Sequence, residues 1–322
     1  MTDYTTDDDT PLDPKQWRIL TDQQRYALID QFFITYYRLF PVFEEFERMA
    51  AQAREAETWI PYGLALLGES GVGKTAAVQH WMKTAPVYRD TSLPEEQKAY
   101  MYISLSAPIT SKALLAGMLR MLGDPSWNRG TTGNMARRLR CLLTIQAKRL
   151  VIFDHIHHFF GPGIDRELYV NVLEQLTLPN DIAVVFIGRL EAAEMLLHTH
   201  SPLPRSIETV RFLRPFQWDK EHLATIREFR QLLQMIDQKL PLDPSNLDDE
   251  ATAHSIYYAT DGNPARIFEL IRLAAKKAVR IRAESLTRQL LAEAYDELIT
   301  SKKRETQKEQ VNPFFVPGFQ ET

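Results

Sequence analysis

The chain has 322 residues, of which 44% are hydrophobic and 25% are charged, and its formal net charge is −4 at pH 7. This composition is typical of a globular protein rather than of a disordered or membrane-embedded chain. No apolar run reaches the roughly 18 residues that a membrane-spanning helix needs, and the acidic N-terminus does not resemble a signal peptide. We therefore expect a cytoplasmic protein without membrane contact, and the single cysteine, Cys141, excludes an internal disulfide framework.

The charge is unevenly distributed along the chain. Residues 1–14 carry five aspartates and no basic residue, so the remainder has a formal charge of about +1. Two stretches are locally basic, Arg129 to Arg149 and Lys276 to Arg282. Either could face phosphate groups, and the alternative is that both are solvated helix faces.

The first predicted element is an acidic leader over residues 1–17, which we expect to be disordered. Thr21 or Asp22 could then cap a helix whose apolar and aromatic residues continue at helical spacing to about Ala56. This pattern predicts a helical N-terminal extension over residues 18–58.

An apolar strand over Leu64–Leu67 leads into a glycine-rich turn and then into a helix that begins at Ala76. This is the setting of a phosphate-binding loop, in which glycines let backbone N–H groups wrap a triphosphate. Lys74 would contact the β/γ-phosphate oxygens, and Thr75 would place its hydroxyl on Mg²⁺. With ATP and Mg²⁺ as cofactors, the predicted binding residues are Gly68, Glu69, Ser70, Gly71, Val72, Gly73, Lys74 and Thr75.

Three further strand-like runs occur at Tyr100–Leu105, Leu150–Phe153 and Ile182–Ile187, each separated from the next by enough chain for a helix. Strands that alternate with helices indicate a parallel sheet with helices on both faces. Short, continuously apolar strands are typical when both faces are covered. We predict an α/β nucleotide-binding domain over residues 59–218.

The strand Leu150–Phe153 ends at Asp154, where a Walker B carboxylate belongs, so Asp154 would hold Mg²⁺ together with Thr75. Hydrolysing members of this NTPase class usually follow this aspartate with a glutamate that polarises water, and here the next residue is His155. A histidine can accept a proton near neutral pH, but it should place water less well than a carboxylate. We therefore expect ATP binding with slow or absent hydrolysis.

The neighbouring His157 and His158 raise the possibility of a zinc site. With no cysteine nearby and no clear carboxylate pattern, packing or solvent contact is the favoured role for both.

Three arginines stand where this NTPase class senses its nucleotide. Arg189 follows the strand Ile182–Ile187, where a threonine or asparagine sensor is usual. Arg205 precedes a return strand and could reach a neighbouring subunit's nucleotide as a finger, and Arg266 suits a second sensor after the turn Asp261–Pro264. Each of the three could instead be a surface arginine.

From about Asp219 the pattern changes to helices alone, which predicts a small all-helical lid domain over residues 219–300. Residues 301–322 read as a flexible polar tether with an aromatic end, Asn312–Phe319. This end is either a docking peptide or a tail that folds back over the protein's own apolar surface.

Taken together, these elements resemble an AAA+ ATPase and, within that class, the TniB/TnsC regulators of DNA transposition. The resemblance covers about residues 18–300 and rests on GESGVGKT (68–75), LVIFDHIHHFF (150–160) and IGRLEAAEML (187–196). The chain departs from the family pattern at His155, where the family tends to have glutamate, and at Arg189, where it tends to have threonine.

The resemblance implies a bacterial, ATP-dependent protein that binds duplex DNA without strong sequence preference and assembles on it as a ring or helical filament. Such a homo-oligomer would link a TniQ-type targeting protein to a DDE transposase. DNA phosphates would be contacted by residues between the second strand and Walker B, and the chain offers Lys112, Arg129, Thr131 and Thr132 there. The alternatives are a nucleotide switch that acts through protein contacts without DNA and a degenerate ATP-binding scaffold.

Overall fold

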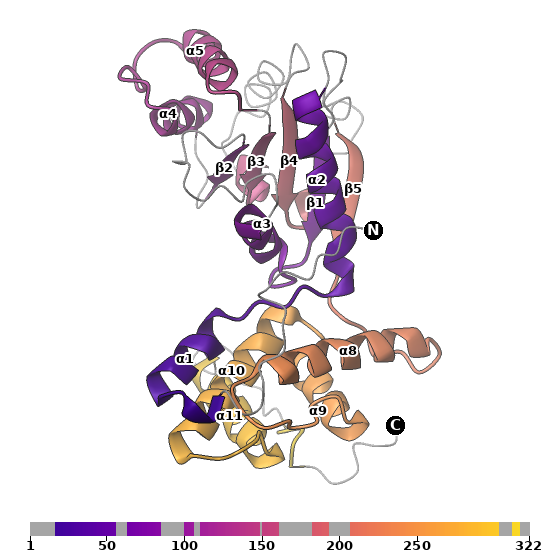
Figure 1. The fold of residues 1–322 in the computed structure, drawn as a ribbon. Helices are drawn as coiled ribbons and strands as arrows, with labels where there is room; N and C mark the ends of the chain where they lie inside the picture. Colours follow the sequence, from indigo (N-terminus) through magenta and orange to yellow (C-terminus); the bar gives the residue numbers. More distant parts are fainter. Residues whose placement is uncertain are drawn as a thin grey trace. The chain divides into compact units, whose positions relative to one another are not determined.

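The computed structural model describes residues 17–55, 63–84, 100–105, 110–148, 150–160, 182–192, 207–302 and 311–315. The chain divides into two compact units, one from residues 37–214 and one from residues 1–36 together with 215–322. We call them the sheet unit and the helical unit, and the sheet and the helix cluster of Figure 1 correspond to them.

Within the described residues, the sheet unit contains β1 (Gly63–Gly68), β2 (Tyr100–Ser104), β3 (Leu150–Asp154), β4 (Ala183–Gly188) and β5 (Ile207–Leu213). Their order in the sheet is β2-β3-β4-β1-β5, and every neighbouring pair is parallel. The predicted parallel α/β sheet is thus confirmed. Because all strands run the same way, the loops after β1, β3 and β4 leave from one edge of the sheet.

Helices pack on both faces of this sheet, namely α2 (Phe40–Glu55), α3 (Lys74–Thr84), α4 (Ser111–Met121) and α5 (Thr132–Ile145). Residues of α4 and α5 share a core with alternate strand residues, among them Ile103, Phe153 and Phe186. This core excludes water from one face of the sheet, and burial of its apolar side chains stabilises the unit.

The opposite face of the sheet packs against α2 and α3, which lie in front of the strands in Figure 1. Trp81 of α3 connects the layers, since its ring centroid is 5.0 Å from that of Phe46 in α2 and 6.3 Å from that of Tyr100 in β2. Side chains alternate along a strand, so Tyr102 shares the face of Tyr100, the face toward α3.

The helical unit is formed by α1 (Asp22–Gln31), α8 (Leu223–Lys239), α9 (Glu250–Thr260), α10 (Pro264–Ile281) and α11 (Arg288–Lys302). Side chains cap the N-termini of three of these helices, with Thr21 before α1, Asp249 before α9 and Asn263 before α10. Thr21 is one of the two caps that the sequence indicated for the first helix. None of the described helices is both long and apolar enough to span a bilayer.

The predicted N-terminal extension over residues 18–58 is divided between the two units. Arg25 in α1 donates two hydrogen bonds, of 2.9 and 3.1 Å, to the carbonyl oxygen of Pro241, and Asp30 forms an ion pair with Lys276. Non-helical backbone over residues 32–36 then separates α1 from the short 3-10 helix Tyr37–Leu39 and from α2 in the sheet unit. Helical periodicity marks an apolar face but does not say which partner covers it.

Part of the C-terminal aromatic segment packs on α11. Phe314 is 3% exposed, its ring centroid lies 6.2 Å from that of Tyr295, and its carbonyl oxygen accepts a 2.6 Å hydrogen bond from Arg288 Nε. Asn312 donates a 2.9 Å bond to the carbonyl oxygen of Ala292. Residues 311–315 therefore follow the fold-back alternative, and residues 316–322 lie outside the described residues. The predicted leader over residues 1–17 also lies outside them except for Trp17, which is 6% exposed and begins the 3-10 helix Trp17–Ile19.

Candidate nucleotide-binding site

The phosphate-binding loop lies between β1 and α3 at the carboxyl edge of the sheet. Gly71 and Gly73 have φ angles of 83° and 94°, a region that residues with a Cβ rarely adopt, so glycine is required at both turns. The loop leads directly into the N-terminus of α3, where backbone N–H groups and the helix dipole favour anions. The structure thus brings the predicted loop residues 68–75 together in one tight turn between β1 and α3.

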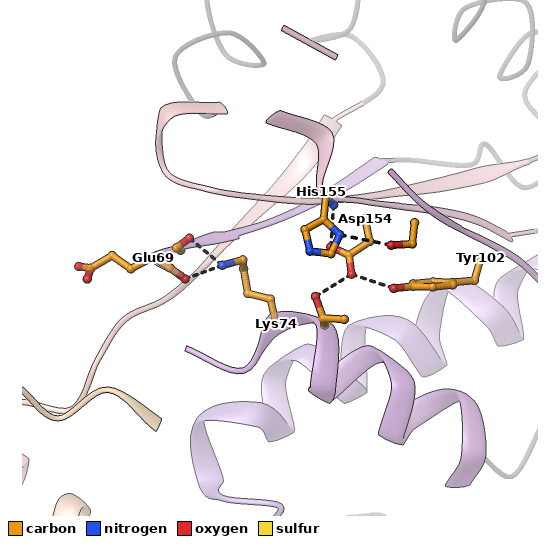
Figure 2. A network of polar contacts seen from close by, with 8 residues as sticks. Glu69, Lys74, Tyr102, Asp154 and His155 are labelled. Carbon is orange, nitrogen blue, oxygen red and sulfur yellow. Dashed lines mark hydrogen bonds and ion pairs between the residues drawn. The ribbon is translucent and has the colours of Figure 1, made fainter. Parts of the chain in front are cut away.

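Lys74 turns back over this loop and donates hydrogen bonds of 2.7 and 2.6 Å to the carbonyl oxygens of Gly68 and Glu69 (Figure 2). Burial lowers the pKa of Lys74 to about 8, with Asp154 opposing the shift and Arg189 adding to it. A lysine in this setting is poorly solvated, which makes a phosphate oxygen a favourable partner for its ammonium group.

Asp154 at the end of β3 is only 1% exposed, and three donors surround its carboxylate. The hydroxyls of Thr75 and Tyr102 donate to Oδ2 over 2.7 and 2.8 Å. Figure 2 shows the Tyr102 hydroxyl directed at the Asp154 carboxylate. The backbone N–H of His155 donates to Oδ1 over 2.7 Å. The two predicted Mg²⁺ ligands, Thr75 and Asp154, are therefore in direct contact although 79 positions separate them.

The donor set fits a magnesium-bound nucleotide. A buried carboxylate and a threonine hydroxyl are hard oxygen ligands of the kind that Mg²⁺ prefers, and the nearby loop presents amides and an ammonium group to phosphate. Asp154 and Thr75 would hold the cation, which in this NTPase class neutralises charge on the β- and γ-phosphates.

His155 occupies the position after Asp154 with a φ of 61°, in the left-handed region that few non-glycine residues adopt. Its ring Nδ1 lies 3.4 Å from Ser104 Oγ and 3.5 Å from Asp154 Oδ1, and its side chain is 42% exposed. The ring is therefore at the rim of the site, next to Asp154 and open to solvent.

His157 follows in the 3-10 helix Ile156–Phe160, with its ring centroid 5.8 Å from that of His155 and 4.3 Å from that of His158. Burial and the positive potential of His158, Arg189 and His155 lower the pKa of His157 to about 4. Its ring is therefore neutral at physiological pH. Within the described residues, no group of three or more His, Cys, Asp or Glu side chains has the geometry of a metal site.

The three sensor candidates have different settings. Arg189 follows β4 and is exposed, close enough to influence both Lys74 and His157 electrostatically. Arg266 lies in the first turn of α10, in the helical unit, where it pairs with Asp261. Arg205 lies outside the described residues.

The candidate DNA-contacting residues border α4 and α5. Lys112, in the first turn of α4, and Arg129, in the loop before α5, are both exposed. Thr131 caps α5 by accepting a hydrogen bond from the Asn134 N–H, and Thr132 is the first residue of that helix.

Two other cations of this basic stretch have internal roles. Arg138 donates to Asp124 Oδ2 and to the carbonyl oxygens of Ser126 and Arg129, at 2.8, 2.8 and 3.0 Å. Lys148 is 2% exposed. Arg138 is engaged in these hydrogen bonds and Lys148 is buried, so the stretch is less available to phosphate than its sequence indicated.

Sequence reasoning missed Tyr102, whose phenol donates to Asp154. The only signal in the sequence is the alternation in β2, which puts Tyr102 and Ser104 on one face. That this face adjoins Asp154 depends on the pairing of β2 with β3, which the sequence pattern does not specify.

Comparisons with known proteins agree with this geometry. The model of the family described as "Bacterial TniB protein" matches residues 25–206, more than half of the chain. A search of curated proteins finds no match.

Several solved structures have a similar fold. The ORC2 protein of Aeropyrum pernix, in ADPNP–ADP complexes, gives a TM-score of 0.63 at 16% identity, with 87% of this chain and 74% of that chain covered. The A. pernix ORC1 protein in complex with DNA gives a TM-score of 0.62 at 18% identity, with 88% of this chain and 72% of that chain covered. Cdc6p from Pyrobaculum aerophilum gives a TM-score of 0.61 at 13% identity, with 84% of this chain and 70% of that chain covered. At these identities the similarity concerns the fold alone, and it agrees with the predicted α/β P-loop fold.

Proposed function

Because the chain belongs to the TniB family of bacterial proteins, we propose that it is an ATP-binding AAA+ regulator of DNA transposition that assembles on duplex DNA. The observation that carries the proposal is the 2.7 Å hydrogen bond between Thr75 and Asp154, which joins the two nucleotide motifs at one edge of the sheet. The assembled protein would link a TniQ-type targeting protein to a DDE transposase in the bacterial cytoplasm.

In this proposal, bound nucleotide connects adjacent copies. One copy holds ATP with its loop, Lys74 and Arg189, and the next copy contacts the same ATP through Arg205, while Arg266 senses it from the helical unit. A ligand that binds only the assembled state stabilises that state by mass action. Assembly should therefore follow the nucleotide state.

Light scattering tests this dependence directly. With a non-hydrolysable ATP analogue, Mg²⁺ and long random-sequence duplex, the wild-type protein should form assemblies much larger than a monomer, and Lys74→Ala should not. Lys83→Ala is a matched control, because Lys83 is an exposed lysine of the same helix, α3. A wild-type protein that stays monomeric with all three ligands would refute the proposal.

DNA contact is proposed through Lys112, Arg129, Thr131 and Thr132. These side chains would bind phosphate groups, so affinity should tolerate any sequence and decrease steeply with salt. Lys112→Ala or Arg129→Ala should weaken binding and reduce the salt slope by about 1 each, and Lys220→Ala in the helical unit controls for loss of an exposed charge. If duplex does not bind while ATP does, the protein is the DNA-independent nucleotide switch.

Hydrolysis should be slow because His155 occupies the position of the water-polarising carboxylate. Replacement His155→Glu should raise steady-state ATP turnover by about 100-fold or more, the usual contribution of a positioned general base. The double variant with Lys74→Ala should lose this gain. Fast turnover by the wild-type protein would contradict the assignment of a weakened Walker B site.

A further inference from the structure

Strand β2 presents a phenol group to the carboxylate of β3. Ser104 pairs in register with Asp154, and Tyr102 pairs with Ile152, two residues earlier on the same face. The Tyr102 ring spans this diagonal distance, so its hydroxyl reaches Asp154 Oδ2 at 2.8 Å. The intervening Ile103 points into the core on the other face of the sheet.

The hydrogen bond from Tyr102 orients the Asp154 carboxylate, which is too deeply buried for water to orient it. Asp154 is 1% exposed, so its hydrogen bonds must come from the protein. Thr75 alone cannot do this for Oδ2, because the same hydroxyl is the predicted second ligand of Mg²⁺. A tyrosine hydroxyl carries its proton at neutral pH, so the phenol is a donor to this carboxylate.

We propose that Tyr102 is a positioning residue that holds the Asp154 carboxylate in the orientation in which it binds Mg²⁺ together with Thr75. Tyr102 thereby sets how much Mg²⁺ adds to nucleotide affinity, although it touches neither the cation nor the nucleotide. The inference rests on the proposed nucleotide site. Its physical basis is that outer-shell partners orient metal ligands, and their loss typically costs about 10–100-fold in metal affinity.

The test is a nucleotide-binding titration of the full chain with a fluorescent ADP analogue, once with Mg²⁺ and once with EDTA. The dissociation constant with EDTA divided by the dissociation constant with Mg²⁺ measures how much Mg²⁺ adds to nucleotide affinity. In Tyr102→Phe this ratio should be smaller than in the wild type by about tenfold, with the EDTA value changed less than about twofold. The ratio is internal to each variant, so a smaller folded fraction cancels.

Tyr100→Phe is the matched control. Tyr100 lies on the same strand and face, is 6% exposed, and packs against Trp81 of α3. Loss of this hydroxyl should leave the Mg²⁺ ratio unchanged. Any general effect of removing a tyrosine hydroxyl from β2 would instead appear in both variants.

The possible outcomes distinguish a failure of the positioning role of Tyr102 from a failure of the proposed nucleotide-binding function. An unchanged ratio in Tyr102→Phe, or equal weakening with Mg²⁺ and with EDTA, would overturn the positioning role. A wild-type protein that binds no nucleotide under either condition would instead overturn the proposed function.

Discussion

Two opposite charges in poorly solvated places characterise the nucleotide site at the residue scale. The Lys74 ammonium is satisfied by two loop carbonyls, and the Asp154 carboxylate by Thr75, Tyr102 and the backbone N–H of His155. Each charge would be costly to bury alone, and these hydrogen bonds offset much of that cost. The site is therefore organised by the protein's own donors and acceptors.

His157 makes the stability of the protein depend on pH. Its folded pKa of about 4 lies below its ordinary 6.5, because burial and nearby positive groups disfavour the charged form. Between these values the unfolded chain binds a proton that the folded protein does not, so the free energy of unfolding should decrease as the pH falls from about 6.5 to about 4.

Replacement His157→Phe should remove this contribution. The buried Nδ1 has no hydrogen-bond partner among the described residues, so an apolar ring should be tolerated at neutral pH. Urea unfolding near pH 7 and near pH 5 measures the effect, and the variant should lose less stability than the wild type on acidification. Equal losses would show that His157 does not titrate in this way.

At the scale of elements, one arginine ties the loop between α4 and α5 to α5. Arg138→Ala would remove three hydrogen bonds and leave Asp124, whose side chain is 9% exposed, without its cation. The free energy of unfolding should fall by about 2 kcal/mol, and DNA affinity should also fall because the loop carries Arg129.

The neighbouring Arg137 is the matched control for this prediction. It is exposed on the same helix, so Arg137→Ala should change stability by less than about 0.5 kcal/mol. Chemical denaturation of both variants decides. Similar stability of Arg138→Ala and the wild type would mean that the three contacts add nothing to the fold.

The C-terminal segment on α11 also contributes to stability. Phe314→Ala should lower the free energy of unfolding by up to about 3 kcal/mol, less than a core phenylalanine at most, because a short segment near the end can detach on its own. Phe315→Ala removes an adjacent ring that is 60% exposed and should have little effect. Thermal unfolding compares the two, and equal transitions would argue against a stabilising role for this segment.

At the scale of the whole molecule, two helices close in sequence belong to different cores. Ile29 of α1 is buried in the helical unit, and Phe46 of α2 is buried in the sheet unit, both with 0% exposure. Alanine at Ile29 should cost about 2–5 kcal/mol, and alanine at Phe46 about 3–5 kcal/mol. The loss of stability from the Ile29 variant should be confined to the helical unit, and the loss from the Phe46 variant to the sheet unit.

Hydrogen exchange resolves this prediction because it reports stability amide by amide. Ile29→Ala should speed exchange in α10, against which α1 packs, and spare α3. Phe46→Ala should do the reverse, since its ring contacts Trp81. Uniform acceleration in both variants would show that the two units unfold as one.

The sequence by itself was sufficient for the features that depend on neighbours along the chain. The phosphate-binding loop needs Gly71, Gly73 and Lys74 between a strand and a helix, and Asp154 needs an apolar strand before it. A short-range pattern also indicated a cap at Thr21 or Asp22, because a capping side chain bonds to backbone two or three residues away.

Only the tertiary structure decided which distant segments meet. The strand order placed Tyr102 beside Asp154, and packing separated α1 from α2 and buried Phe314 on α11. The tertiary structure also pairs Arg138 with Asp124, whereas the basic stretch around Arg138 suggested a contact with phosphate. Apolar periodicity and charge show that a surface needs a partner, but the partner's identity depends on contacts between residues far apart in the chain, which local patterns do not encode.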